Sequence, residues 1–332
     1  MKYSQTFYKK QTKTYILFTL AALFCVSAFA CSLLLGSVKL DFSALLDGVY
    51  RKILLYVRLP RALACLTAGA GLAVSGAIIQ ITLANRLASP SLIGVNAGAG
   101  LAITLCTALG IFGGLQTSLF SFAGAFAAVM LVTCGAKKFS ASRGTLILAG
   151  VALNSFLNAI SAAVITLIPE VGVLSNDFKV GDFSAVTYGR LIPAAILTVL
   201  ALGVSFTLTN VMDVMTLGEE NAAGLGLGVT AARTLLLLLA ALLAGAAVSM
   251  AGLLSFVGLV VPHAVRRMGA RGAAHLLPLS ALFGAGFVTL CDTVARTAFA
   301  PYELPVGIIM AFIGAPFFIL LLIKGKGGEA LD

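Results

Sequence analysis

Nine long apolar runs follow one another along this chain, with only short polar connections between them. Each run approaches the roughly 20 residues that a helix needs to cross the hydrocarbon core of a bilayer. Charged residues make up 10% of the 332 residues, whereas soluble domains contain about 25%. We therefore expect one transmembrane domain over residues 1–332, built only from α-helices. The runs lie at 15–36, 62–84, 92–109, 115–135, 145–168, 191–209, 234–250, 276–291 and 305–323.

The number of spans follows from the apolar stretch 234–262 and from the charges at the chain ends. As one helix these 29 residues would rise about 43 Å, against a hydrocarbon core of about 30 Å. The lysines at 2–13 and Lys324 with Lys326 both favour the cytoplasm, so the number of spans must be even. We therefore place a short eighth span at 253–265. This predicts about ten helices, with both termini and Arg266 to Arg271 in the cytoplasm.

Charge and cysteine content exclude several other classes of protein. The net charge of +10 comes from bases between the apolar runs, where they set topology and meet anionic lipid head groups, so nucleic-acid binding is excluded. The six cysteines show no paired spacing, which predicts neither a disulfide framework nor a metal site. The stretch 28–30 reads AFA, like a signal-peptidase site, but the apolar run continues past it, so we expect an uncleaved first helix.

The centres of the spans carry almost no ionisable residue. Carriers coupled to protons or sodium ions usually need a buried carboxylate or histidine, so an ion-coupled secondary transporter is the weaker alternative. No nucleophile and base are paired in the spans, so we predict no catalytic residue and no enzymatic activity. The sequence also lacks a GxxxxGK[ST] phosphate loop, and an ATPase that drives transport would therefore be a separate chain.

The segment before the second run is unusually basic for its side of the membrane. With ten helices it lies outside, where positive residues are disfavoured, yet it contains Arg51, Lys52, Arg58 and Arg61. One interpretation is that arginines at a helix end extend to the interface. The other interpretation, which the unfavourable topology supports, is that they bind a partner protein.

Three further stretches combine polar and small residues in distinctive order. GEENAAGLGL at 218–227 has acidic residues in a first turn and a glycine after the last, which suits a short helix, although a polar connector would also fit. FVGLVVPH at 256–263 ends in His263, which has no neighbouring ligand cluster, so a structural role is favoured over metal binding. Asp292 and Arg296 are spaced for an i,i+4 ion pair and precede ELPVG at 303–307 and GAPFF at 314–318.

These three stretches, with RLPR at 58–61 and NRLASP at 85–90, resemble the FecCD-type permeases of type II ABC importers over nearly the whole chain. That family moves ferric siderophores, haem or cobalamin across the inner (plasma) membrane. The resemblance implies the all-α type II importer fold, a second permease subunit (the same or a close relative), two ATP-binding-cassette ATPases and an extracytoplasmic substrate-binding protein. It implies no cofactor bound by this chain, because the partner ATPases use the ATP.

The resemblance also assigns roles to individual residues. Two positions depart from the family pattern: Arg86 replaces a proline, and no tryptophan precedes the sixth run, where this chain reads KVGDF at 179–183. Asn154 and Asn158, spaced i,i+4, are expected to form interhelical hydrogen bonds, and Gln80 could do the same. The implied roles are docking of the binding protein for Arg58, Arg61 and Arg296; the cytoplasmic gate and path for Gln80, Asn85 and Leu87; and coupling to the ATPase for Gly218, Glu219, Glu220, Ala222, Leu225 and Gly226.

Overall fold

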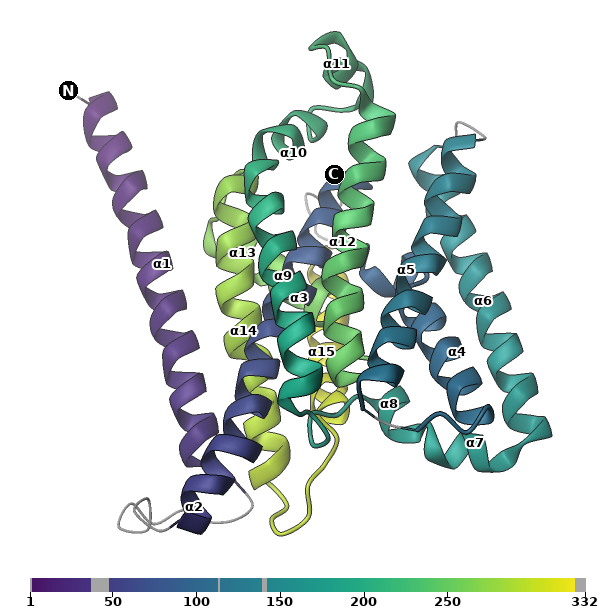
Figure 1. The fold of residues 1–332 in the computed structure, drawn as a ribbon. Helices are drawn as coiled ribbons and strands as arrows, with labels where there is room; N and C mark the ends of the chain where they lie inside the picture. Colours follow the sequence, from purple (N-terminus) through teal and green to yellow (C-terminus); the bar gives the residue numbers. More distant parts are fainter. Residues whose placement is uncertain (1, 37–47, 113, 139–141, 326–332) are drawn as a thin grey trace.

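The computed structural model describes residues 2–36, 48–112, 114–138 and 142–325, and it confirms an all-helical membrane fold (Figure 1). Lys326, one of the bases used to orient the C-terminus, lies outside these ranges. Seven helices in the described ranges are long and apolar enough to cross a membrane. These are α1 (Lys2–Leu34), α3 (Leu59–Thr82), α5 (Gly114–Lys138), α6 (Arg143–Leu167), α9 (Tyr188–Thr207), α12 (Val229–Ala251) and α14 (Ala273–Thr297).

Three further helices occupy the remaining predicted spans: α4 (Val95–Ala108), α13 (Val257–Met268) and α15 (Val306–Gly325). The prediction of a span at 253–265 was wrong in its bounds, because α13 begins four residues later. Gly252 and Phe256 adopt positive φ angles of 73° and 67°, which a continuing right-handed helix does not allow. The backbone therefore breaks between α12 and α13.

Short helices lie at the two ends of the molecule. Figure 1 shows α10 (Thr209–Met215), α11 (Glu219–Gly224) and the start of α1 together at one end, which we call the α11 end. The opposite end, which we call the α2 end, contains α2 (Gly48–Ile53), α7 (Pro169–Leu174) and α8 (Asn176–Val180). The π-helical η2 (Leu54–Arg58) joins α2 to α3, and the 3₁₀ helix η3 (Pro90–Ile93) precedes α4.

Helix α3 lies at the centre of the packing. It contacts α9, α12, α13 and α14, while α12 also packs against α5 and so joins the group formed by α4, α5 and α6. Glycines make the closest approaches: a Cβ added to Gly69 or Gly76 would overlap the backbone of Gly284 or Gly258. Small residues at helix contacts let backbones approach closely, as expected in a membrane bundle.

The break between α12 and α13 is filled by α8 and the residues after it. Irregular backbone at membrane depth is tolerated only where other protein groups satisfy its polar atoms. Here backbone hydrogen bonds join the break to α8, and a further bond joins the same segment to the start of α15. The donors and acceptors are Leu253 N to Phe178 O at 2.8 Å, Asp182 N to Ala251 O at 2.8 Å, and Gly307 N to Gly181 O at 3.1 Å.

Candidate functional site

The three arginines predicted to dock a binding protein lie close together at the α2 end, and their side chains are buried. Arg61 donates to Asp292 at 2.9 Å and to Glu303 at 2.7 Å. Arg296 approaches the other oxygen of Asp292 at 3.1 Å, so the i,i+4 pair expected from the sequence is present. Asp292 itself is fully buried. The carboxylate partners of Arg61 were not predicted, since Asp292 is 231 residues away in the sequence.

Arg58 and Arg296 also bind the last turn of α1. Arg58 Nη1 donates to the carbonyl oxygens of Leu33 and Leu34 at 2.8 and 2.9 Å, and Arg296 Nη2 donates to Ser32 Oγ at 2.9 Å. The final carbonyl groups of a helix have no partner within the helix, and arginine side chains can satisfy them. The network therefore holds the ends of α1, α3 and α14 together, and docking by these arginines stays a prediction.

Of the predicted gate residues, Asn85 and Leu87 lie on the turn that follows α3, at the α11 end, and Gln80 lies in the last turn of α3. Asn85 Oδ1 accepts a hydrogen bond from the Leu87 backbone at 2.8 Å, which is an Asx turn. Gln80 is buried; its Nε2 donates to the Gly258 carbonyl at 3.0 Å, and its Oε1 accepts from Arg266 of α13. Gln80 thus forms the interhelical hydrogen bonds that the sequence allowed, and a gating role stays a prediction.

The stretch at 218–227 forms a short helix, one of the two structures that its residues allowed. Gly218 and Gly226 flank α11 with positive φ angles of 97° and 82°, which glycine adopts without strain. Within this stretch, Ala222 is fully buried, whereas Leu225 is 67% exposed. The helix is the most protruding described element at its end of the molecule (Figure 1).

Glu219 of α11 links this short helix to two spans. Its carboxylate lies 2.8 Å from Arg143 Nε at the start of α6 and also pairs with Arg233 of α12. Glu220 is exposed and forms no ion pair within the described residues. The ion pairs of Glu219 were not predicted, because its partners lie on other helices. They give α11 a direct connection to α6.

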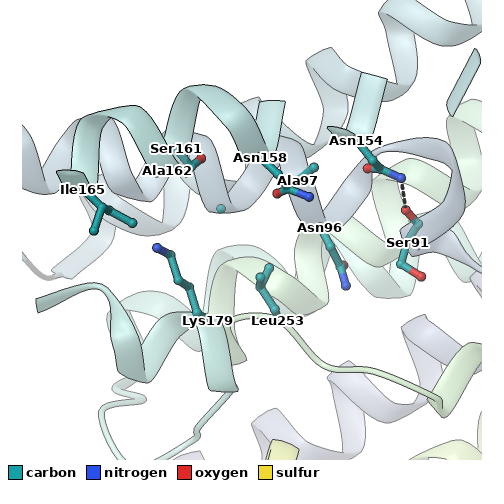
Figure 2. Close-up of a pocket in the computed structure, with 11 residues that line it drawn as sticks. Ser91, Asn96, Ala97, Asn154, Asn158, Ser161, Ala162, Ile165, Lys179 and Leu253 are labelled. Carbon is teal, nitrogen blue, oxygen red and sulfur yellow. Dashed lines mark hydrogen bonds between the residues drawn. The ribbon is translucent and has the colours of Figure 1, made fainter. Parts of the chain in front are cut away.

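A pocket of about 480 Å³ opens along α6 (Figure 2). Asn154, Asn158, Ser161, Ala162 and Ile165 share one face of this helix and form one wall. The sequence predicted the two asparagines as interhelical hydrogen bonders, and Asn154 Nδ2 does donate to Ser91 O at 2.8 Å. The other lining residues are Ser91 of η3, Asn96, Ala97 and Gly100 of α4, Lys179 of α8, and Leu253.

Lys179 is the one ionisable residue among those that line the pocket. Figure 2 shows its ammonium group extending from α8 across the pocket towards α6. Burial lowers the pKa of this ammonium from its ordinary value. Lys179 belongs to the stretch KVGDF before the sixth run, and no local pattern in the sequence marks it as a site residue.

His263 of α13 is buried, and its ring meets Phe317 of α15 edge to face at 6.3 Å. This packing agrees with the structural role that the sequence favoured. Within the described residues, no group of three or more histidine, cysteine, aspartate or glutamate side chains could hold a metal ion.

Comparisons with known proteins give one consistent result. Residues 21–324 match the FecCD transport family. The chain is 37% identical to the Fe(3+)-citrate import system permease protein YfmD of Bacillus subtilis, covering 84% of both chains. It is 39% identical to the vitamin B12 import system permease protein BtuC of Yersinia enterocolitica, covering 81% of both. A solved inward-facing ABC transporter assigned to the metal-chelate type superimposes with a TM-score of 0.84 at 29% identity, covering 93% of this chain and 99% of that chain.

Proposed function

Because this chain belongs to the FecCD transport family, we propose that it is the membrane-spanning permease subunit of an ATP-driven importer for a ferric siderophore, haem or cobalamin. Two relatives, 37% and 39% identical to this chain, are permeases of Fe(3+)-citrate and vitamin B12 import systems, and this supports the proposed class of transported ligand. The chain itself performs no covalent chemistry in this proposal. A substrate-binding protein captures the ligand, so the permease needs to hold it only weakly.

The observation that carries the proposal is the position of α11. A short helix that protrudes from one end of the bundle, with Leu225 exposed at its end, suits insertion into a cleft of a separate ATPase. ATP binding and hydrolysis would close and reopen the ATPase dimer and move α11. Glu219 would pass this motion to α6 and α12, so that the path alternates between its two sides.

The two ends of the molecule would bind different partner proteins. The α11 end would be cytoplasmic, with both termini and two ATPases, and the α2 end would receive the binding protein. Arg58, Arg61 and Arg296 would act there by fixing the ends of α1, α3 and α14, since their side chains are buried. A second permease subunit would cover exposed apolar residues of α6 and α15, such as Phe156 and Phe312.

The test is ATPase association and uptake with a substitution on the exposed part of the coupling segment. Leu225→Arg should release the ATPase and abolish ATP-driven uptake without unfolding the permease, because Leu225 packs against little of the chain itself. The measurement is co-purification of the ATPase, together with uptake in proteoliposomes. Leu174→Arg, at an equally exposed leucine at the α2 end, is the matched control and should leave ATPase association unchanged. Full ATPase binding by the Leu225→Arg protein would contradict the proposal.

A further inference from the structure

The pocket along α6 contains polar groups that have no partner within the described residues. Asn154 uses its amide nitrogen for Ser91, but its Oδ1 is buried and accepts no hydrogen bond. The side chains of Asn96, Asn158 and Lys179 take part in no hydrogen bond or ion pair within the described ranges. Groups of this kind, placed around a cavity, are available to a ligand.

The chemistry of these groups is mainly that of donors. The side chains of Asn96 and Asn158 each supply an NH₂ group, and Lys179 supplies up to three N–H donors and a positive charge. The Asn154 amide nitrogen and the Ser161 hydroxyl already donate to backbone carbonyls, so Asn154 offers only its Oδ1, as an acceptor. No carboxylate lines the pocket to neutralise this charge. Asp177 and Asp182, which are close to Lys179 in sequence, are not among the lining residues. A ligand that carries oxygen acceptors and negative charge would complement this lining.

The place of the pocket connects it to transport. It lies against α6, the helix that Glu219 of α11 holds through Arg143. It also includes Lys179 of α8 and Leu253 of the break, which backbone hydrogen bonds tie together. A volume of about 480 Å³ is within the range of small-molecule sites, which is roughly 300 to 1,000 Å³.

We propose that this pocket is a weak substrate subsite that selects negatively charged, oxygen-rich metal chelates, with Lys179 as its charge-selective residue and the amides of Asn96 and Asn158 as hydrogen-bond donors. This inference rests on the proposed importer function and narrows its substrate class. Neutral ligands of similar size would lack the attraction to Lys179. Electrostatic complementarity of this kind acts on specificity and association rate more than on affinity.

The test measures the electrostatic potential of the pocket without needing the transported ligand. In a variant whose native cysteines are replaced, Ala162→Cys places a thiol in the pocket wall. The reaction rates of an anionic and a cationic methanethiosulfonate reagent of similar size are compared on the permease in nanodiscs. Lys179→Gln should lower the ratio of anionic to cationic rate by about fivefold to tenfold, as expected for one unit charge at short range in a hydrated site. Lys179→Arg should preserve the ratio.

Two controls separate the pocket from its surroundings. Ala163→Cys lies next to Ala162 on the exposed surface of α6 but does not line the pocket, so its ratio should not depend on residue 179. Ferric citrate, which is anionic, should slow labelling of the Ala162→Cys variant by a neutral thiol reagent, whereas a neutral ferric trihydroxamate should not. Protection by ferric citrate should be lost with Lys179→Gln.

The outcomes distinguish this inference from the proposed function. If residue 179 does not change the labelling ratio, if aqueous reagents do not reach position 162, or if ferric citrate gives no protection, the subsite is overturned, even where ATP-driven uptake is intact. A potential and a protection pattern as expected, with no ATP-driven uptake by the complete importer, would support the subsite and contradict the importer function.

Discussion

Helices α3 and α6 are similar in length and apolar character but occupy opposite environments in the protomer. Their most apolar stretches have mean hydropathies of 2.0 and 1.8, yet 78% of that stretch is buried in the span containing α3 and 11% in α6. Hydropathy therefore identifies a span but does not show whether the span is buried among other helices or lies at the surface of the chain. In a bilayer, lipid tails are as apolar as leucine side chains, so apolar residues suit both environments.

What distinguishes the two helices is the size and pairing of particular side chains. Helix α3 brings Gly69 and Gly76 against other backbones and contains, in its first turn, Arg61, which is paired within the protein. Helix α6 presents Asn158 and Phe156 at its surface and connects to α11 by the ion pair of Arg143. We conclude that α3 is held by close packing and a buried ion network, whereas α6 is mostly exposed and carries polar groups on one face.

The largest expected effect is the loss of the buried charge that holds α3 to α14. Asp292→Asn would leave Arg61 and Arg296 without their shared carboxylate, and breaking a buried ion pair costs roughly 3 to 5 kcal/mol of unfolding free energy. The measurement is unfolding in mixed micelles of increasing SDS content. Asp177→Asn makes the same chemical change at an exposed residue of α8 and should alter stability by less than about 0.5 kcal/mol. If the two substitutions lowered the unfolding free energy equally, the buried ion network would not distinguish α3 from α6.

A smaller effect is expected from one added methyl group on α3. In Gly76→Ala the new Cβ would overlap the Gly258 carbonyl, and overpacking of this kind typically costs about 1 to 3 kcal/mol. Gly203 lies on an exposed face of α9, and a Cβ added there would meet no neighbouring group within 4 Å. The better helix propensity of alanine in Gly203→Ala should therefore stabilise the protein by up to about 1 kcal/mol. The same unfolding assay compares the two. A stabilising Gly76→Ala would show that α3 and its neighbours are not closely packed.

The smallest effect on stability is expected at the link between α6 and α11. Glu219→Gln removes the charge that pairs with Arg143 and Arg233, and partly exposed ion pairs contribute about 1 kcal/mol or less. Under the proposed function, uptake per ATP hydrolysed should nevertheless fall severalfold, because the motion of α11 would reach α6 less directly. Glu170→Gln, at an exposed carboxylate of α7 at the opposite end of the molecule, should leave both quantities unchanged. A Glu219→Gln permease with normal coupling would mean that α6 follows α11 without this ion pair.

The sequence predicted the architecture better than the contacts. Apolar runs and terminal charges predicted an all-helical membrane fold with a short span before Arg266. The residue at which that short helix begins depends on the positive φ angles of Gly252 and Phe256. Phe256 gives no local signal for such a conformation, since few residues other than glycine adopt it. The glycines and acidic residues at the ends of 219–224 suited a short helix, but a polar connector fitted them as well, and the family resemblance favoured the helix that is found.

Contacts between distant segments could not be predicted from one sequence. The unfavourable topology of Arg58 and Arg61 marked this segment as special, but nothing local indicated that Arg61 would meet Asp292. The pocket shows the same limit. The i,i+4 spacing of Asn154 and Asn158 was visible, whereas the approach of Lys179 depends on how α8 fills the break after α12.

The filled break has a consequence for hydrogen exchange at the α2 end. Amides in connecting segments normally exchange quickly with solvent deuterium, because little structure must open to expose them. The amides of Leu253 and Asp182 lie in such segments, and that of Gly307 lies in the first turn of α15, where amides have no partner within the helix. Each of the three nevertheless donates to a backbone carbonyl on another segment. They can exchange only when α8, the break and the start of α15 separate from one another. In a deuterium-exchange time course these three amides should therefore exchange slowly and at a common rate, as one cooperative unit surrounded by fast-exchanging connections.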